Sequence, residues 1–130
     1  MGDSISDFIT IIRNASRARK ETCEAQFSKM HLGIANILKA EGFIRDVREV
    51  KNEKGHKRIH ITLKYVDEVP ALTNIQRKSK SGCRLYYKAK EIPHELNGLG
   101  VSILTTSKGL LKDRAARREN IGGEIVCTVW

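Results

Sequence analysis

The chain has 130 residues and a mass of 14.7 kDa; 40% of its residues are hydrophobic and 30% are charged. That length suits one compact domain or two small lobes, and the composition excludes a disordered chain. No apolar run approaches the ~20 residues that span a bilayer, and acidic residues stand at the start, where a secretory signal peptide would be basic. We therefore expect a cytoplasmic protein without a membrane partner.

The charge balance is strongly basic. There are 24 Lys and Arg against 15 Asp and Glu, which gives a net charge of +9 and a pI near 9.7. The excess is spread over both halves, with +5 in residues 1–65 and +4 in residues 66–130. A surplus of this size on a folded surface is typical of proteins that bind polyanions, of which nucleic acid is the commonest. The alternative is a basic protein whose charge serves only solubility.

In the first half, the apolar pattern predicts two helices and three strands. The first helix begins near Ser4, and its apolar face holds Ile5, Phe8, Ile9, Ile12 and Ala15. The second begins after Ser28 and ends before Gly42, where glycine can adopt the left-handed conformation that ends many helices. Strands are expected over 22–27, 43–50 and 59–65, and a polar turn at 51–56 joins the last two.

In the second half, short strands alternate with turns. Residues 67–70 suggest a hinge, and strands are expected over 72–79, 83–87, 101–106 and 124–130. A helical turn over 91–98 and a short basic helix over 114–119, capped by Asp113, complete the pattern. The sequence thus predicts an α+β fold of two small packed lobes. We expect residues 1–66 to form a helix–strand–helix–hairpin lobe, and residues 67–130 to form a mostly antiparallel β lobe with short helices.

The sequence gives little support for an active site, a metal site or a disulfide bond. Cys23, Cys83 and Cys127 are widely separated and odd in number, which argues against disulfides and against a zinc site. The four histidines stand at no ligand spacing. No nucleophile motif, carboxylate pair or dinucleotide fingerprint is present. We expect no catalytic residue, no metal and no cofactor.

Residues 77–90 are the most basic run, with six Lys and Arg and no acid. In a strand, Arg84, Tyr86 and Lys88 share one face, while Leu85 and Tyr87 share the other. Cations that follow phosphates and an aromatic ring that stacks on a base are what an RNA-reading sheet needs. The alternative is an edge strand that is kept charged to prevent aggregation.

Two further segments could contact RNA. The first, Thr105, Thr106, Ser107, Lys108 and Gly109, offers hydroxyls, a cation and a glycine at a strand end. The second is Gly122, Gly123 and Glu124, in which the acid could accept a hydrogen bond from a base amino group. The alternatives are an ordinary polar turn for the first, and a chain reversal followed by a surface acid for the second.

Taken in order, several motifs resemble one family over nearly the whole chain. They are Ile12-Arg13-Asn14-Ala15, Ser28-Lys29, Glu41-Gly42-Phe43-Ile44, Leu63-Lys64-Tyr65, Asn97-Gly98-Leu99-Gly100, Thr106-Ser107-Lys108-Gly109, Asp113-Arg114-x-Ala116-Arg117 and Gly122-Gly123-Glu124-Ile125. The sequence with these motifs resembles the bacterial-type small-subunit ribosomal protein number eight family.

The resemblance implies a structural constituent of the small ribosomal subunit, which binds the central domain of the ribosomal RNA (rRNA) directly and nucleates its assembly. It assigns RNA recognition mainly to the second lobe, residues 67–130, through the loop 105–109 and Tyr86. It also places Arg13, Asn14 and Lys29 of the first lobe near a second RNA segment. Thr105 stands where the family usually has serine, and Tyr87 where a basic or aliphatic residue is usual.

The same resemblance implies small-subunit proteins number five and twelve as neighbours. Because some relatives repress their own messenger RNA, a translational repressor of its own operon is the alternative function.

Overall fold

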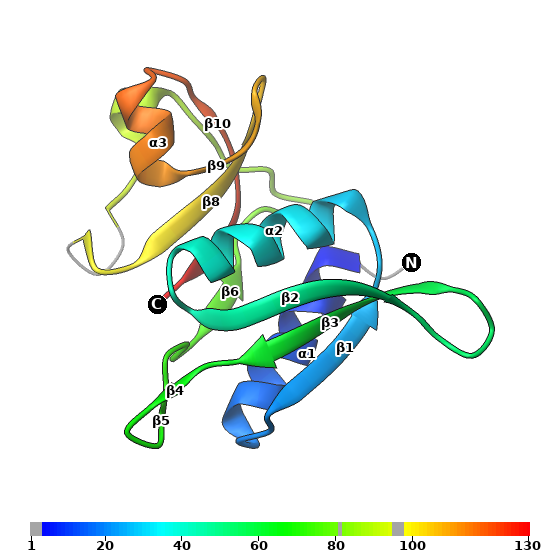
Figure 1. The fold of residues 1–130 in the computed structure, drawn as a ribbon. Helices are drawn as coiled ribbons and strands as arrows, with labels where there is room; N and C mark the ends of the chain where they lie inside the picture. The colour runs from blue at the N-terminus through cyan, green and yellow to red at the C-terminus, as the bar shows by residue number, and fades with distance from the viewer. Residues whose placement is uncertain (1–3, 81, 95–97) are drawn as a thin grey trace. The chain divides into compact units, whose positions relative to one another are not determined.

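In the computed structural model the chain divides into two units, each with its own sheet, and the boundary lies between Thr73 and Asn74 (Figure 1). The structure describes residues 4–80, 82–94 and 98–130. The sequence placed the division after residue 66 and predicted a hinge at 67–70. Instead, Asp67 and Glu68 form the turn of a hairpin inside the first unit, both with positive φ.

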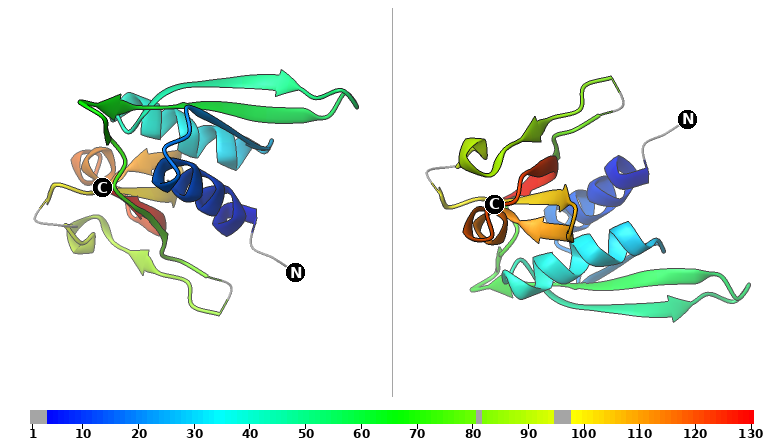
Figure 2. Two further views of the ribbon diagram at one scale, coloured as in Figure 1. Left: turned by 90° about the horizontal axis from the view of Figure 1, so that it is seen from below. Right: turned by 90° about the horizontal axis from the view of Figure 1, so that it is seen from above.

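The first unit packs two helices on one face of a three-stranded antiparallel sheet (Figure 2). Its elements are α1 (Ser4–Arg17), β1 (Thr22–Gln26), α2 (Lys29–Ala40), β2 (Ile44–Lys51), β3 (Lys57–Leu63), and the short hairpin of β4 (Tyr65–Val66) and β5 (Val69–Pro70). The strand order is β1-β3-β2. The two helices and three strands predicted for this half are therefore confirmed.

The core of this unit follows from the periodicity of its sequence. Alternate residues of β3, which are Ile59, Ile61 and Leu63, are buried because every second side chain of a strand points to the same face. Helix α1 buries Phe8, Ile9 and Ile12, and α2 buries Ile34 and Leu38. Ser28 caps α2 as expected, since its hydroxyl oxygen accepts the backbone N–H of His31 at 2.9 Å.

All three helices of the described residues are followed by a left-handed residue. Gly42 takes this conformation after α2, as expected, with φ +83°. Arg19 and Asn120 do the same after α1 and α3 with φ of 55° and 57°. In each case two backbone N–H groups turn back to the last helical carbonyls, which satisfies groups that the helix leaves without partners.

The second unit is a five-stranded antiparallel sheet with β10 at its centre. Its elements are β6 (Ile75–Arg77), β7 (Tyr86–Tyr87), the 3-10 turn η1 (Ala89–Glu91), β8 (Val101–Thr106), β9 (Gly109–Lys112), α3 (Asp113–Arg118) and β10 (Gly123–Val129). One edge of β10 pairs with β8, and the other pairs with β6 and then β7. The α+β class predicted from the sequence is confirmed.

Several local predictions in this unit were wrong. The strands expected at 72–79 and 83–87 are short, and β9 was not expected. Of the helical turn expected over 91–98, Glu91 ends the 3-10 turn η1, Gly98 is in 3-10 conformation, residues 92–94 are not helical, and 95–97 lie outside the described residues. Asp113 does not cap α3 but is its first residue; its buried carboxylate pairs with Arg117 one turn later, at 3.1 Å.

The three cysteines differ in their access to solvent, and this predicts their reactivity. Burial raises the pKa of Cys127 to about 12 and that of Cys23 to about 11, whereas Cys83 is exposed. Because the thiolate is the reacting form, we expect an aromatic disulfide reagent at pH 8 to modify one thiol rapidly, and the other two only after denaturation. The variant Cys83→Ser should lose the fast phase. Two or more fast thiols in the native protein would contradict this burial.

Candidate nucleic-acid interface

A row of side chains crosses the sheet of the second unit. Tyr86 of β7 lies directly opposite Glu124 of β10, which in turn lies opposite Thr105 of β8. Directly opposed residues of antiparallel strands point to the same face. Since neighbouring strands are ~5 Å apart, Tyr86 and Thr105 lie roughly 10 Å apart across this face.

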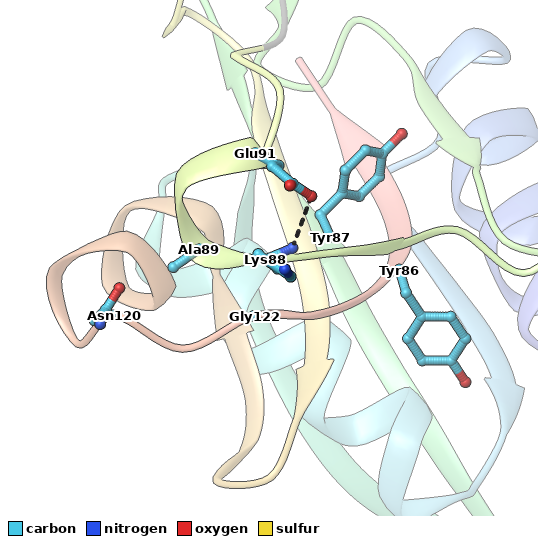
Figure 3. A pocket seen from close by; sticks show the side chains of 7 residues that line it. All are labelled: Tyr86, Tyr87, Lys88, Ala89, Glu91, Asn120 and Gly122. Carbon is cyan, nitrogen blue, oxygen red and sulfur yellow. Dashed lines mark hydrogen bonds between the residues drawn. The ribbon is translucent and has the colours of Figure 1, made fainter.

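The segment 84–88 splits its side chains as the sequence predicted. Arg84, Tyr86 and Lys88 are exposed, and the Tyr86 side chain is among the most exposed of the large apolar residues, at 70%. Tyr87 is half-buried and packs against the core cluster, which consists of Ile92, Leu104, Ala116 and Ile125. Figure 3 shows the two tyrosine rings pointing to opposite sides of the chain, beside a hollow of about 510 Å³. One face thus holds the core, and the other is open to a ligand.

Glu124 is a largely buried acid within this basic face. Its Oε2 accepts a hydrogen bond from Nη1 of Arg84 at 3.0 Å, and its side chain is 11% exposed against 51% for Arg84. The expected alternative of a simple surface acid is therefore wrong. Loss of Arg84 would leave a buried carboxylate without its cation, which is costly because a buried charge needs a partner. Arg84 therefore positions Glu124 as well as adding charge.

The loop 105–109 is a tight hairpin between β8 and β9. The Thr106 hydroxyl donates to the Gly109 carbonyl at 2.8 Å and accepts the Lys108 backbone N–H at 3.1 Å. Gly109 has φ +93°, a conformation that favours glycine. Thr106 therefore closes the turn, whereas Ser107 and Lys108 are exposed at its tip and Thr105 lies on the open face.

Gly122 and Gly123 allow close approach between strands. A Cβ at Gly122 would lie 2.3 Å from the Tyr87 carbonyl oxygen, and one at Gly123 would lie 2.3 Å from the Thr105 carbonyl oxygen. Neither glycine has a positive φ; the left-handed residue before them is Asn120. The alternative that these glycines serve only to reverse the chain is therefore wrong, because they let β10 approach closely the strands that carry Tyr86 and Thr105.

The three candidates of the first unit lie on two helices. Arg13 and Asn14 are consecutive residues of α1, the first half-buried and the second exposed. Lys29 is the exposed first residue of α2. These residues belong to the other unit and do not form part of the row across the second sheet.

Sequence reasoning missed the Arg84–Glu124 ion pair and strand β9. The pair joins residues 40 positions apart, so no local pattern could show it. The signal for β9 was the apolar pair Leu110 and Leu111 directly after a turn; Leu110 extends the open row opposite Thr105. Within the described ranges, no three His, Cys, Asp or Glu side chains gather to hold a metal, and no helix is long and apolar enough to cross a membrane.

Comparison with known proteins gives one consistent family. The family described as "Ribosomal protein S8" matches residues 3–130. Proteins named "Small ribosomal subunit protein uS8" from Opitutus terrae, Paracoccus denitrificans and Enterococcus faecalis are 52%, 47% and 49% identical. Each alignment covers 100% of this chain and 98–100% of the relative. The chain belongs to the ribosomal protein S8 family, and these relatives carry the name of a small-ribosomal-subunit protein.

Proposed function

We propose that this protein is a structural component of the small ribosomal subunit, which binds the central domain of the rRNA directly and helps to nucleate its assembly. The observation that supports this most is the open row of Tyr86, Glu124 and Thr105, flanked by Arg84 and Lys88. Family membership supports the ribosomal role, and the geometry supports the choice of the second unit as the RNA-binding surface.

Charge supplies the first part of the affinity. Residues 74–130 contain 11 Lys and Arg against 5 Asp and Glu. Cations that neutralise phosphates release condensed counterions, so this contribution is steeply salt-dependent and carries little sequence information. Lys88 and Lys108 are exposed and suited to this role.

Shape and hydrogen bonding supply the second part. The exposed ring of Tyr86 offers a face on which an unpaired base or a ribose can pack. Thr105 and Ser107 offer hydroxyls that can donate to phosphates or pair with the ribose 2′-hydroxyl. These contacts read an irregular RNA helix better than a regular duplex, whose deep groove excludes side chains.

On the subunit, we expect the partners to be the rRNA and neighbouring small-subunit proteins, with proteins number five and twelve as the expected neighbours, in the cytoplasm. The role is structural, and no step in it requires catalysis.

Three substitutions of hydroxyl side chains, at Thr105, Thr106 and Ser107, test whether the loop 105–109 binds RNA. Thr105→Val and Ser107→Ala should each weaken binding to a central-domain rRNA fragment by about tenfold, because a hydrogen bond to RNA is worth about 1–3 kcal/mol when its partner is left unsatisfied. Neither change should lower thermal stability by much. Thr106→Val should lower both the rRNA affinity and the thermal stability, since the Thr106 hydroxyl makes two hydrogen bonds within the turn.

Binding is measured by salt-titrated gel shift against the rRNA fragment and a scrambled duplex. Preference for the fragment, reduced in Thr105→Val and Ser107→Ala, supports the proposal. Equal affinity of the unsubstituted protein for both RNAs would refute specific recognition of the central domain.

A further inference from the structure

The end of the β2–β3 hairpin carries cations without acidic partners. We call residues 51–58 the hairpin tip; its cations are Lys51, Lys54, Lys57 and Arg58, and its acid is Glu53. Among the described residues no ion pair joins any of these four cations to a carboxylate. Elsewhere in the same unit, Lys39 and Arg48 both approach Asp46, at 3.1 and 3.9 Å, and lower its pKa.

The tip places two like charges directly opposite each other. Lys51 and Lys57 are cross-strand partners, and both are exposed. Such a pair destabilises a hairpin, whereas an acid at either position would stabilise it. Strand β1 ends at Gln26, opposite Arg58, so beyond that row the hairpin has only two strands. Figures 1 and 2 show it extending past α2.

The cations are nevertheless held on a well-defined backbone. The Asn52 side-chain oxygen accepts the backbone N–H groups of Lys54 and His56 at 3.0 and 2.9 Å, which closes the loop. The Lys57 ammonium lies 5.1 Å from the centroid of the Phe27 ring. Beside it is a hollow of about 600 Å³, whose lining includes Phe27, His56, Lys57 and Arg58. Because the loop is already ordered, binding of a ligand at the tip loses less conformational entropy of the chain than binding at a flexible loop would.

We propose that the hairpin tip binds the phosphate backbone of RNA, as a contact of the first unit that does not involve Arg13, Asn14 or Lys29. This inference rests on the proposed RNA-binding function and adds to it a surface separate from the row around Tyr86. The tip contributes affinity without sequence recognition, because its groups are cations and the face of Phe27 is already covered by Lys57.

RNA fits the tip better than an acidic protein does. A protein interface needs an apolar centre, and the exposed large apolar residues of the described chain are Ile11, Val66, Val69, Tyr86 and Leu99, none of which lies in the tip. Phosphates need only several spaced cations, which the two strands and their loop supply.

Two triple variants with equal charge test the proposal on the complete chain. The tip variant carries Lys51→Gln, Lys54→Gln and Lys57→Gln. The control carries Lys20→Gln, Arg45→Gln and Lys64→Gln, which removes the same charge from the same unit. The slope of the logarithm of the association constant against the logarithm of the salt concentration is measured with small-subunit rRNA and with a scrambled duplex. We expect the tip variant to reduce the slope by about 2–3 units and the control by less than about one. Equal reductions, or none in the tip variant, would overturn the proposal.

A single charge reversal separates binding from structure. Lys51→Glu converts the like-charged pair with Lys57 into an attractive one, so it should raise the melting temperature slightly. It should also weaken rRNA binding at least about fivefold. A purely structural tip would leave rRNA affinity unchanged. Binding of a polyglutamate peptide that depends on the tip while the rRNA slope does not would assign the tip to an acidic protein instead.

These results are distinguishable from failure of the proposed function. If the unsubstituted protein does not prefer the central-domain fragment, the assignment of the second unit fails. The slopes measured on the scrambled duplex still report whether the hairpin tip contacts phosphates.

Discussion

Alanine at Gly122 or Gly123 should destabilise the second unit by about 2–4 kcal/mol, at the upper end of the range for overpacked sites. The added Cβ would meet a backbone carbonyl oxygen at 2.3 Å in both cases, and a carbonyl within a sheet cannot move aside as a flexible side chain can. Strand β10 would have to separate from β7 or from β8. We therefore expect the hydrogen bonds that hold the Tyr86 row to weaken together with overall stability.

Gly82→Ala is the matched control for this prediction. No atom lies within 4 Å of a Cβ built at Gly82, and its φ is not positive, so alanine there should be neutral or slightly stabilising. Unfolding in urea is followed by the fluorescence of Trp130, the single tryptophan, which lies in the second unit. If Gly122→Ala and Gly82→Ala unfold at the same urea concentration, the close strand approach is not what these glycines provide.

Tyr86→Ala should weaken binding to the central-domain rRNA fragment by about 10- to 100-fold, which corresponds to the ~1–3 kcal/mol of one base stacked on an aromatic ring. The same change should leave stability nearly unaltered, because the Tyr86 side chain is 70% exposed in the free protein. Tyr86→Phe retains the ring and should retain most of the affinity. The salt slope should stay constant, since no cation is removed.

Leu99→Ala provides the comparison for an exposed apolar side chain of the same unit. Leu99 is 81% exposed and lies outside the row around Tyr86, so its truncation should change neither affinity nor stability. Equal losses in Tyr86→Ala and Leu99→Ala would show that the assay reports general surface changes. No loss in Tyr86→Ala would remove stacking on this ring from the mechanism.

The local pattern of the sequence was sufficient for the two helices and the three-stranded sheet of the first unit, but not for the β4–β5 hairpin, where it predicted a hinge. Helices α1 and α2 have one apolar face each, β3 alternates, and Ser28 and Gly42 lie at the two ends of α2 as predicted. These features depend on residues within a few positions of one another, so a local reading can find them. The strands of the second unit were harder to predict from the sequence, because β6 and β7 are short and form only by pairing with β10, which is far along the chain.

In the candidate site, too, some features follow from neighbouring residues and others from the pairing of distant strands. The sequence by itself determined the basic charge, the alternation that exposes Tyr86 and buries part of Tyr87, and the hydroxyl-rich turn at 105–109, because these are properties of composition and of neighbouring residues. Only the tertiary structure decided that Tyr86, Glu124 and Thr105 share one row, that Arg84 partners Glu124, and that Gly122 and Gly123 permit close strand approach. Register, burial and ion pairing between distant residues depend on which strands lie side by side, and strand pairing is set by the packing of the whole sheet.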